Sequence, residues 1–108
     1  MPAAARGNGV DSVFSITGSG SSKAGCPAPL VTATDACSGN VFVNNAGAVR
    51  IGDSVAAHVA GGCGTDTSGL TKASGSVFVN GAGMGRIGDE YTGDNTIISG
   101  SNNVFVGG

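Results

Sequence analysis

Short apolar runs separated by glycine-rich polar turns recur along the chain. Val-Phe-Val stands at 41–43 and again at 77–79, each time followed by Asn, Ala and Gly and then by Arg-Ile-Gly-Asp. β-Branched and aromatic residues in runs this short favour strands over helices. The intervening turn residues are typical of a hairpin, and Asn80-Gly81 is the stronger of the two turn signals. The pattern therefore predicts an all-β protein made of short strands and hairpins.

The two segments are copies of one motif. Residues 38–53 read SGNVFVNNAGAVRIGD and residues 74–89 read SGSVFVNGAGMGRIGD, so 12 of 16 positions are identical at an offset of 36. A third copy is divided between the ends: residues 103–108 read NVFVGG, and residues 6–11 read RGNGVD, a longer form of the closing Arg-x-Gly-Asp. Joining the ends would restore the motif. We therefore expect adjacent termini and a pseudo-threefold arrangement of three lobes.

Composition permits one ordered domain with a modest core. The 108 residues form a single predicted domain, 1–108, in which 21 residues are Gly, 5% are aromatic and none is Trp. A net charge of −2 without a basic stripe argues against nucleic acid or anionic lipid as partners. The N-terminal residues lack a signal-peptide pattern, and no apolar run is long enough to span a bilayer. We expect synthesis in the cytoplasm and no stable membrane insertion.

Each copy contains one arginine followed by one aspartate, and these are all the arginines of the chain. The pairs are Arg6 with Asp11, Arg50 with Asp53, and Arg86 with Asp89. We expect an Arg–Asp contact that orders each hairpin, since such pairs usually serve local structure; catalytic carboxylates are the alternative. The aromatic residues of the three copies are Phe42, Phe78 and Phe105. We expect them to fill the small core rather than to form a ligand cage.

The stretches between the copies, 17–36, 54–73 and 90–98, are rich in polar residues and predict loops that need an additional constraint. In or beside them lie every cysteine and the only histidine: Cys26, Cys37, His58 and Cys63. Four such ligands could form one closed tetrahedral zinc site, which would pin the loops together. The spacing lacks paired Cys-x-x-Cys, so two alternatives stay open: a single disulfide, or small buried thiols beside a surface histidine. A closed site without a second histidine disfavours a metalloenzyme.

The motifs of this chain resemble those of the PAAR-repeat family. The resemblance rests on Pro2-Ala3-Ala4-Ala5-Arg6 followed by Asp11, and on the later Val-Phe-Val-Asn and Arg-Ile-Gly-Asp copies, and it covers nearly the whole chain. It implies a small sharp cone of short strands that tips the trimeric β-helical spike of a contractile phage tail or type VI secretion system. It also implies a structural metal at the narrow end, zinc or else iron. His58 stands where a family-like histidine is expected, and cysteines replace the others.

The resemblance implies a mechanical role without a reaction. One monomeric cap would seat its wide base on one trimeric spike and sharpen that spike for membrane puncture. The residues expected to face the spike are Val41, Phe42, Val43, Val77, Phe78, Val79, Val104, Phe105 and Val106. The cap would be made in the host cytoplasm, assembled at the tip of a phage tail or secretion spike, and delivered through the target envelope. A carbohydrate-binding or adhesive module is the alternative, followed by a metalloenzyme.

Overall fold

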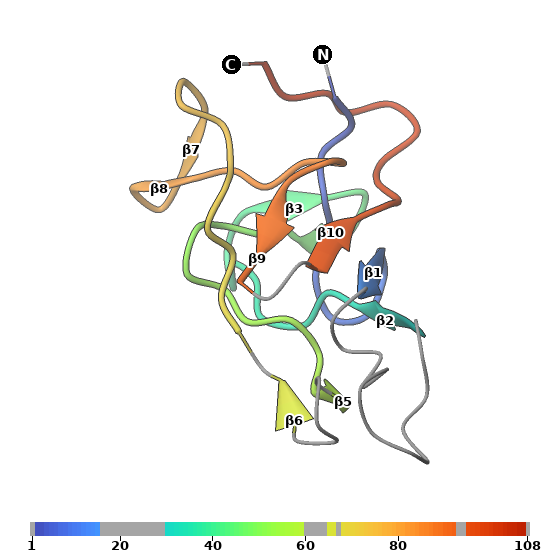
Figure 1. Ribbon diagram of the computed structural model, residues 1–108. Helices are drawn as coiled ribbons and strands as arrows, with labels where there is room; N and C mark the ends of the chain where they lie inside the picture. The colour runs from blue at the N-terminus through green and yellow to red at the C-terminus, as the bar shows by residue number, and fades with distance from the viewer. Residues whose placement is uncertain (1, 16–29, 60–64, 67, 93–94, 108) are drawn as a thin grey trace.

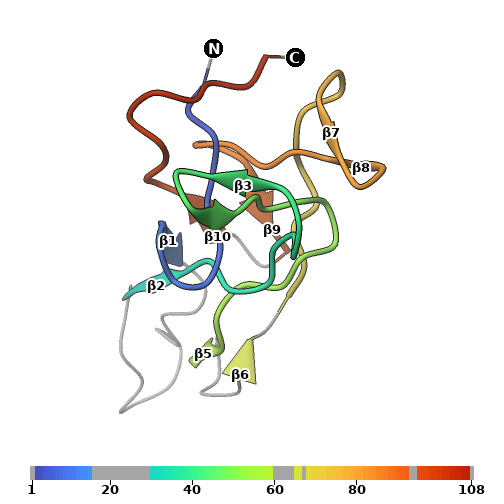
Figure 2. The same cartoon turned by 180° about the vertical axis from the view of Figure 1, so that it is seen from behind.

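The computed structural model describes residues 2–15, 30–59, 65–66, 68–92 and 95–107. Within these ranges the regular structure is strand only, which confirms the all-β prediction, and they contain no helix that could cross a membrane. The molecule is elongated, with extents of 41 × 23 × 21 Å. Both chain ends lie at one end of it, and the hairpin of β5 (His58–Val59) and β6 (Thr65–Asp66) lies at the other (Figures 1 and 2).

Two hairpins of the same design belong to the repeated motif. The strands are β3 (Phe42–Val43), β4 (Ala46–Gly47), β7 (Phe78–Val79) and β8 (Ala82–Gly83), paired β3 with β4 and β7 with β8. The turn residues have positive φ: Asn44 51°, Asn45 68°, Asn80 52° and Gly81 80°. Two such residues form the turn whose twist matches that of the flanking strands, and Asn and Gly adopt this conformation most easily. The Asn-rich turns thus set the hairpins locally.

The first and last segments of the chain pair as predicted. The Ala4 amide donates to the Val104 carbonyl at 2.9 Å, and the Val106 amide donates to the Pro2 carbonyl at 2.8 Å. Residues 2–4 thereby hold the position that β4 and β8 hold in the hairpins. The two ends of the chain complete a third strand pair beside the two hairpins (Figure 1).

A four-stranded sheet, with single bridges beside it, forms a closed ring of strands. The antiparallel sheet has the order β2 (Leu30–Ala33), β1 (Ser12–Ser15), β10 (Asn95–Ile97) and β9 (Glu90–Tyr91). Single bridges continue it on both sides, namely Thr34 with Val55, Ser54 with Gly69, and Leu70 with Tyr91. These bridges lead from β2 through the segments before β5 and after β6 to β9, so the ring closes on itself. Closure removes the open edges that a four-stranded sheet would otherwise expose.

The prediction of loops between the copies is wrong for the described parts of those stretches. They supply β2, β5, β6, β9 and β10, and three of the most buried side chains: Leu70 and Tyr91 are 2% exposed and Ile97 is 1% exposed. Their strand partners come from other parts of the ring. Composition alone does not show that polar backbone will pair with a distant segment, because β-structure depends on its neighbours.

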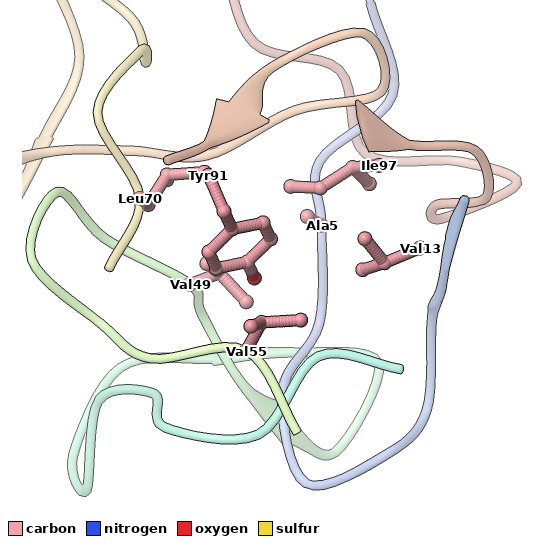
Figure 3. Close-up of a cluster of buried hydrophobic side chains, with 7 residues drawn as sticks. All are labelled: Ala5, Val13, Val49, Val55, Leu70, Tyr91 and Ile97. Atoms are coloured by element: carbon pink, nitrogen blue, oxygen red, sulfur yellow. The ribbon is translucent and has the colours of Figure 1, made fainter. Parts of the chain in front are cut away.

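Two apolar clusters fill the interior. The first consists of Ala5, Val13, Val49, Val55, Leu70, Tyr91 and Ile97 (Figure 3). The second consists of Ala4, Val43, Ala48, Val79, Met84 and Val106. The Tyr91 ring lies among the aliphatic side chains of the first cluster, and its buried hydroxyl has no hydrogen-bond partner within the described part of the chain. Burial, followed by the charges of Asp53, Asp11 and Asp35, raises the pKa of this hydroxyl.

A closed cycle of backbone hydrogen bonds ties the copies together at the centre. The Ala5 amide donates to Gly85 at 3.0 Å, Gly85 donates to Val49 at 2.8 Å, and Val49 donates to Ala5 at 3.3 Å. At Gly85 there is little room for a side chain, because a Cβ would lie 3.0 Å from Leu70 Cδ2 and 3.2 Å from Val49 Cγ1. Each copy is therefore bonded to both of the others.

Candidate partner-binding face

The Val-Phe-Val segments expose large apolar side chains. Phe42 and Phe78 are 60% exposed and Phe105 is 52% exposed. The prediction that these residues fill the core is therefore wrong. Successive side chains of a strand point to opposite faces, and the valine after each Phe is the one that points inward. Those valines, Val43, Val79 and Val106, belong to the second cluster.

Six of the nine predicted spike-facing residues are accessible. Besides the three Phe residues these are Val41 and Val77, both 37% exposed, and Val104, which is half-buried. The other three are the inward-pointing valines, which support the strands from behind. The six accessible residues are all apolar and come from equivalent positions of the three copies.

The backbone at each Phe is open as well. Phe42 faces Gly47, Phe78 faces Gly83, and Phe105 faces Ala3. The neighbouring bonds, such as the one at 3.0 Å from the Met84 amide to the Val77 carbonyl, identify these as non-hydrogen-bonded pairs. In such pairs the amide and carbonyl point away from the opposite strand. The outward carbonyls of Gly47, Gly83 and Ala3 accept bonds from Gly7, Ile51 and Ile87.

Among the described residues, the outward amides and carbonyls of the three Phe residues have no partner. Each copy therefore presents a strand edge with one donor, one acceptor and one exposed aromatic side chain. An edge of this kind is a template for pairing with another chain.

A serine in each copy donates a hydrogen bond to a turn asparagine or a backbone carbonyl of a neighbouring copy. Ser38, Ser74 and Ser101 are buried, and their hydroxyls accept the amides of Val41, Val77 and Val104 at 3.0, 2.9 and 3.0 Å. The same hydroxyls donate to Asn80 Oδ1 at 2.7 Å, the Gly107 carbonyl at 2.6 Å and Asn44 Oδ1 at 2.5 Å. These serines are not among the site residues predicted from the sequence. A Ser three residues before each Val-Phe-Val is the pattern that indicates them.

The three predicted Arg–Asp pairs are confirmed. In each pair the guanidinium binds both carboxylate oxygens at 2.9–3.0 Å, and the arginine amide donates to the same carboxylate. Arg50 Nη1 also donates to Asn80 Oδ1 at 3.1 Å, so the pair extends to the next copy. Burial alone would raise the pKa of Asp11, but hydrogen bonds from Arg6 and Ser99 outweigh it and lower that pKa. These carboxylates order the hairpins, as expected.

The four predicted metal ligands fall partly outside the described structure. Cys26 and Cys63 lie outside the described residues, and only the backbone of His58 is described, in β5. Cys37 is half-buried between two glycines: a Cβ on Gly7 or on Gly47 would lie 2.6 Å from its Sγ. Burial, followed by the charge of Asp53, raises the pKa of the Cys37 thiol. In the part of the chain with described positions, no three His, Cys, Asp or Glu residues gather to hold a metal.

The described residues enclose no pocket, so the open strand edges are their most distinctive surface chemistry. Compared with known proteins, the chain matches no family model and no curated protein.

Proposed function

We propose that this protein caps the blunt end of a trimeric β-helical spike, as its resemblance to the PAAR-repeat family implies. The observation that carries the proposal is the set of three open strand edges at Phe42, Phe78 and Phe105, all in equivalent positions of the repeated motif. The proposed role is mechanical and involves no reaction and no nucleic acid.

The cyclic contacts support a pseudo-threefold arrangement of three PAAR-like repeats. The amides of Ser38, Ser74 and Ser101 donate to the carbonyls of Ala48, Met84 and Ala4 at 2.8, 3.0 and 2.9 Å. These serines and acceptors occupy matching positions in the three copies, and the central cycle and the Arg–Asp pairs repeat in the same way. A single chain with three such units can repeat one set of contacts on a trimer without forming a trimer itself. One monomeric cap per spike follows.

The chemistry of the face fits the end of a β-helix. Strands that end at a blunt tip leave amides and carbonyls unpaired, and the open edges at the Phe residues carry the complementary donors and acceptors. Covering the exposed 60% of Phe42 or Phe78 would contribute about 2 kcal/mol for each ring. Three apolar edges would thus supply both the register and a large part of the affinity.

The proposal includes a structural metal at the narrow end, held by Cys26, Cys37, His58 and Cys63. Thiolate and imidazole ligands suit zinc, and iron is the second candidate. Such a metal would tie the backbone of β5 to the segments that carry the cysteines. The close packing of Cys37 between Gly7 and Gly47 favours the alternative role for that thiol, a small apolar side chain instead of the fourth ligand. The assembled cap would travel at the tip of a phage tail or a secretion spike through the target envelope.

The test is reconstitution with a recombinant trimeric β-helical spike protein. Native mass spectrometry should detect one cap per spike trimer. The double variant Phe42→Ser/Phe78→Ser should remain folded and lose the complex. Val31→Ser is the matched control, because Val31 is also 60% exposed but lies on β2 in the ring of strands. A free cap in the presence of spike, or equal loss of binding in the control, would count against the proposal.

A further inference from the structure

The three strand pairs of the partner-binding face are closed in different ways. Asn44-Asn45 joins Val43 to Ala46 in the first, and Asn80-Gly81 joins Val79 to Ala82 in the second. In the third pair, Val106 and Pro2 hold the corresponding positions, but no turn joins them. Two pairs are hairpins, whereas the third is held by non-covalent contacts alone.

The third pair also has fewer hydrogen bonds. In each hairpin the residues beside the turn form a hydrogen-bonded pair, which exchanges two backbone bonds. At the third position the Val106 amide donates to Pro2 at 2.8 Å, but Pro2 has no amide hydrogen to return the bond. Without a connecting turn, opening of the third pair frees two short terminal segments, whereas in a hairpin the two-residue turn keeps the opened strands close together. The third pair is therefore the weakest of the three.

Opening of this pair would disturb a limited set of contacts. Val106 is 2% exposed and would leave the second cluster. The Gly107 carbonyl would release the Ser74 hydroxyl, 2.6 Å away, and Arg86 Nη1, 3.4 Å away. The ring of strands and the first cluster contain no residue from 104–107. The pair can thus open while the ring of strands and the first cluster stay intact.

We propose that the pairing of residues 2–4 with 104–107 is a latch that opens and closes in the folded protein. Only the closed latch presents Phe105 in line with Phe42 and Phe78. The consequence for binding rests on the proposed function: a trimeric spike binds the closed form, and its apparent dissociation constant rises in proportion as the closed fraction falls.

Three equivalent amides provide an internal comparison for the test. The amides of Ala4, Ala48 and Met84 donate to the carbonyls of Val104, Val41 and Val77 at 2.9, 2.9 and 3.0 Å. All three residues are buried. Hydrogen exchange measured by NMR, corrected for intrinsic rates, should give Ala4 a protection factor about tenfold or more below those of the other two. Equal protection of the three amides would overturn the latch.

A circular permutant separates the missing turn from any local property of the segment. Met1 is removed, Gly108 is joined to Pro2, and the chain is opened between Asn80 and Gly81. Val106 and Pro2 are then joined by Gly107-Gly108, a two-residue Gly-Gly turn of the kind that suits a hairpin. The least protected amide should move from Ala4 to Met84. If Met84 is protected as strongly as Ala48 in the permutant, the missing turn does not weaken a strand pair and the latch is rejected.

Addition of a recombinant trimeric β-helical spike protein tests the link to function. Binding should raise the protection of Ala4 by a larger factor than that of Ala48. An equal increase at both amides would reject the link between latch and partner. Absence of any complex would reject the proposed function, whereas the comparison of amides in the free protein would still decide whether the latch exists.

Discussion

Phe78 and Val79 are neighbours in β7 with opposite surroundings, and their truncation to alanine should have opposite consequences. Phe78 is 60% exposed, whereas Val79 is 3% exposed and packs in the second cluster. Phe78→Ala removes a whole ring, and Val79→Ala removes only two methyl groups. We nevertheless expect the valine substitution to cost more folding stability.

The magnitudes follow from the buried fractions. Full burial of a Phe side chain contributes up to about 3 kcal/mol, so the 40% of Phe78 that is already covered accounts for about 1 kcal/mol of the free energy of unfolding. Two buried carbon atoms of Val79 account for about 1.6 kcal/mol, and the cavity left behind raises the cost to about 2 kcal/mol. The free energy of unfolding of Phe78→Ala should therefore be about 1 kcal/mol higher than that of Val79→Ala.

Urea denaturation followed by circular dichroism measures both free energies directly. In thermal melts, 1 kcal/mol corresponds to about 4–8 °C for a domain near this size. In binding experiments with a trimeric spike the order should reverse, because Phe78→Ala removes contact area worth about 2 kcal/mol, or more than about tenfold in affinity. If Phe78→Ala destabilises the fold as much as Val79→Ala, the ring is buried in solution and our account of the face is wrong.

Three further predictions concern the interior and the metal. Tyr91→Phe should raise the free energy of unfolding by about 1–2 kcal/mol in urea denaturation, because it removes a buried hydroxyl without a described partner; a loss of stability would show that the hydroxyl is bonded. Asp11 has a lowered pKa in the folded state, so its contribution is complete above the ordinary aspartate pKa of about 3.9 and is lost as the pH falls through the lower folded value. Asp11→Asn should cost roughly 2 kcal/mol at neutral pH and flatten the acid limb of a stability–pH profile, and an unchanged limb would contradict this assignment. Elemental analysis should find about one metal per chain, and the metal should be lost in Cys26→Ser, His58→Ala and Cys63→Ser. Cys37→Ala shows whether Cys37 is the fourth ligand or a packing thiol. A metal-free wild-type protein would reject the site.

Local chemistry and internal repetition made much of this fold readable from the amino-acid sequence. The Asn-rich turns require only two residues with positive φ, and each hairpin Arg–Asp pair lies within three positions along the chain. The divided third copy predicted the pairing of the chain ends, because the missing half of a repeated motif must find the other half. These inferences succeeded because each depends on residues close in sequence or on a copy of the same motif.

The tertiary structure decided which side chains face inward and which segments pair. Val-Phe-Val contains no signal for its own orientation, since all three residues are apolar, and only packing against the other copies turns Val79 inward and Phe78 outward. The described parts of the polar stretches between copies form strands because a closed ring supplies distant backbone partners, and Leu70, Tyr91 and Ile97 anchor them in the first cluster. Burial and strand pairing are non-local, so they emerge only when three copies of a short motif share one interior.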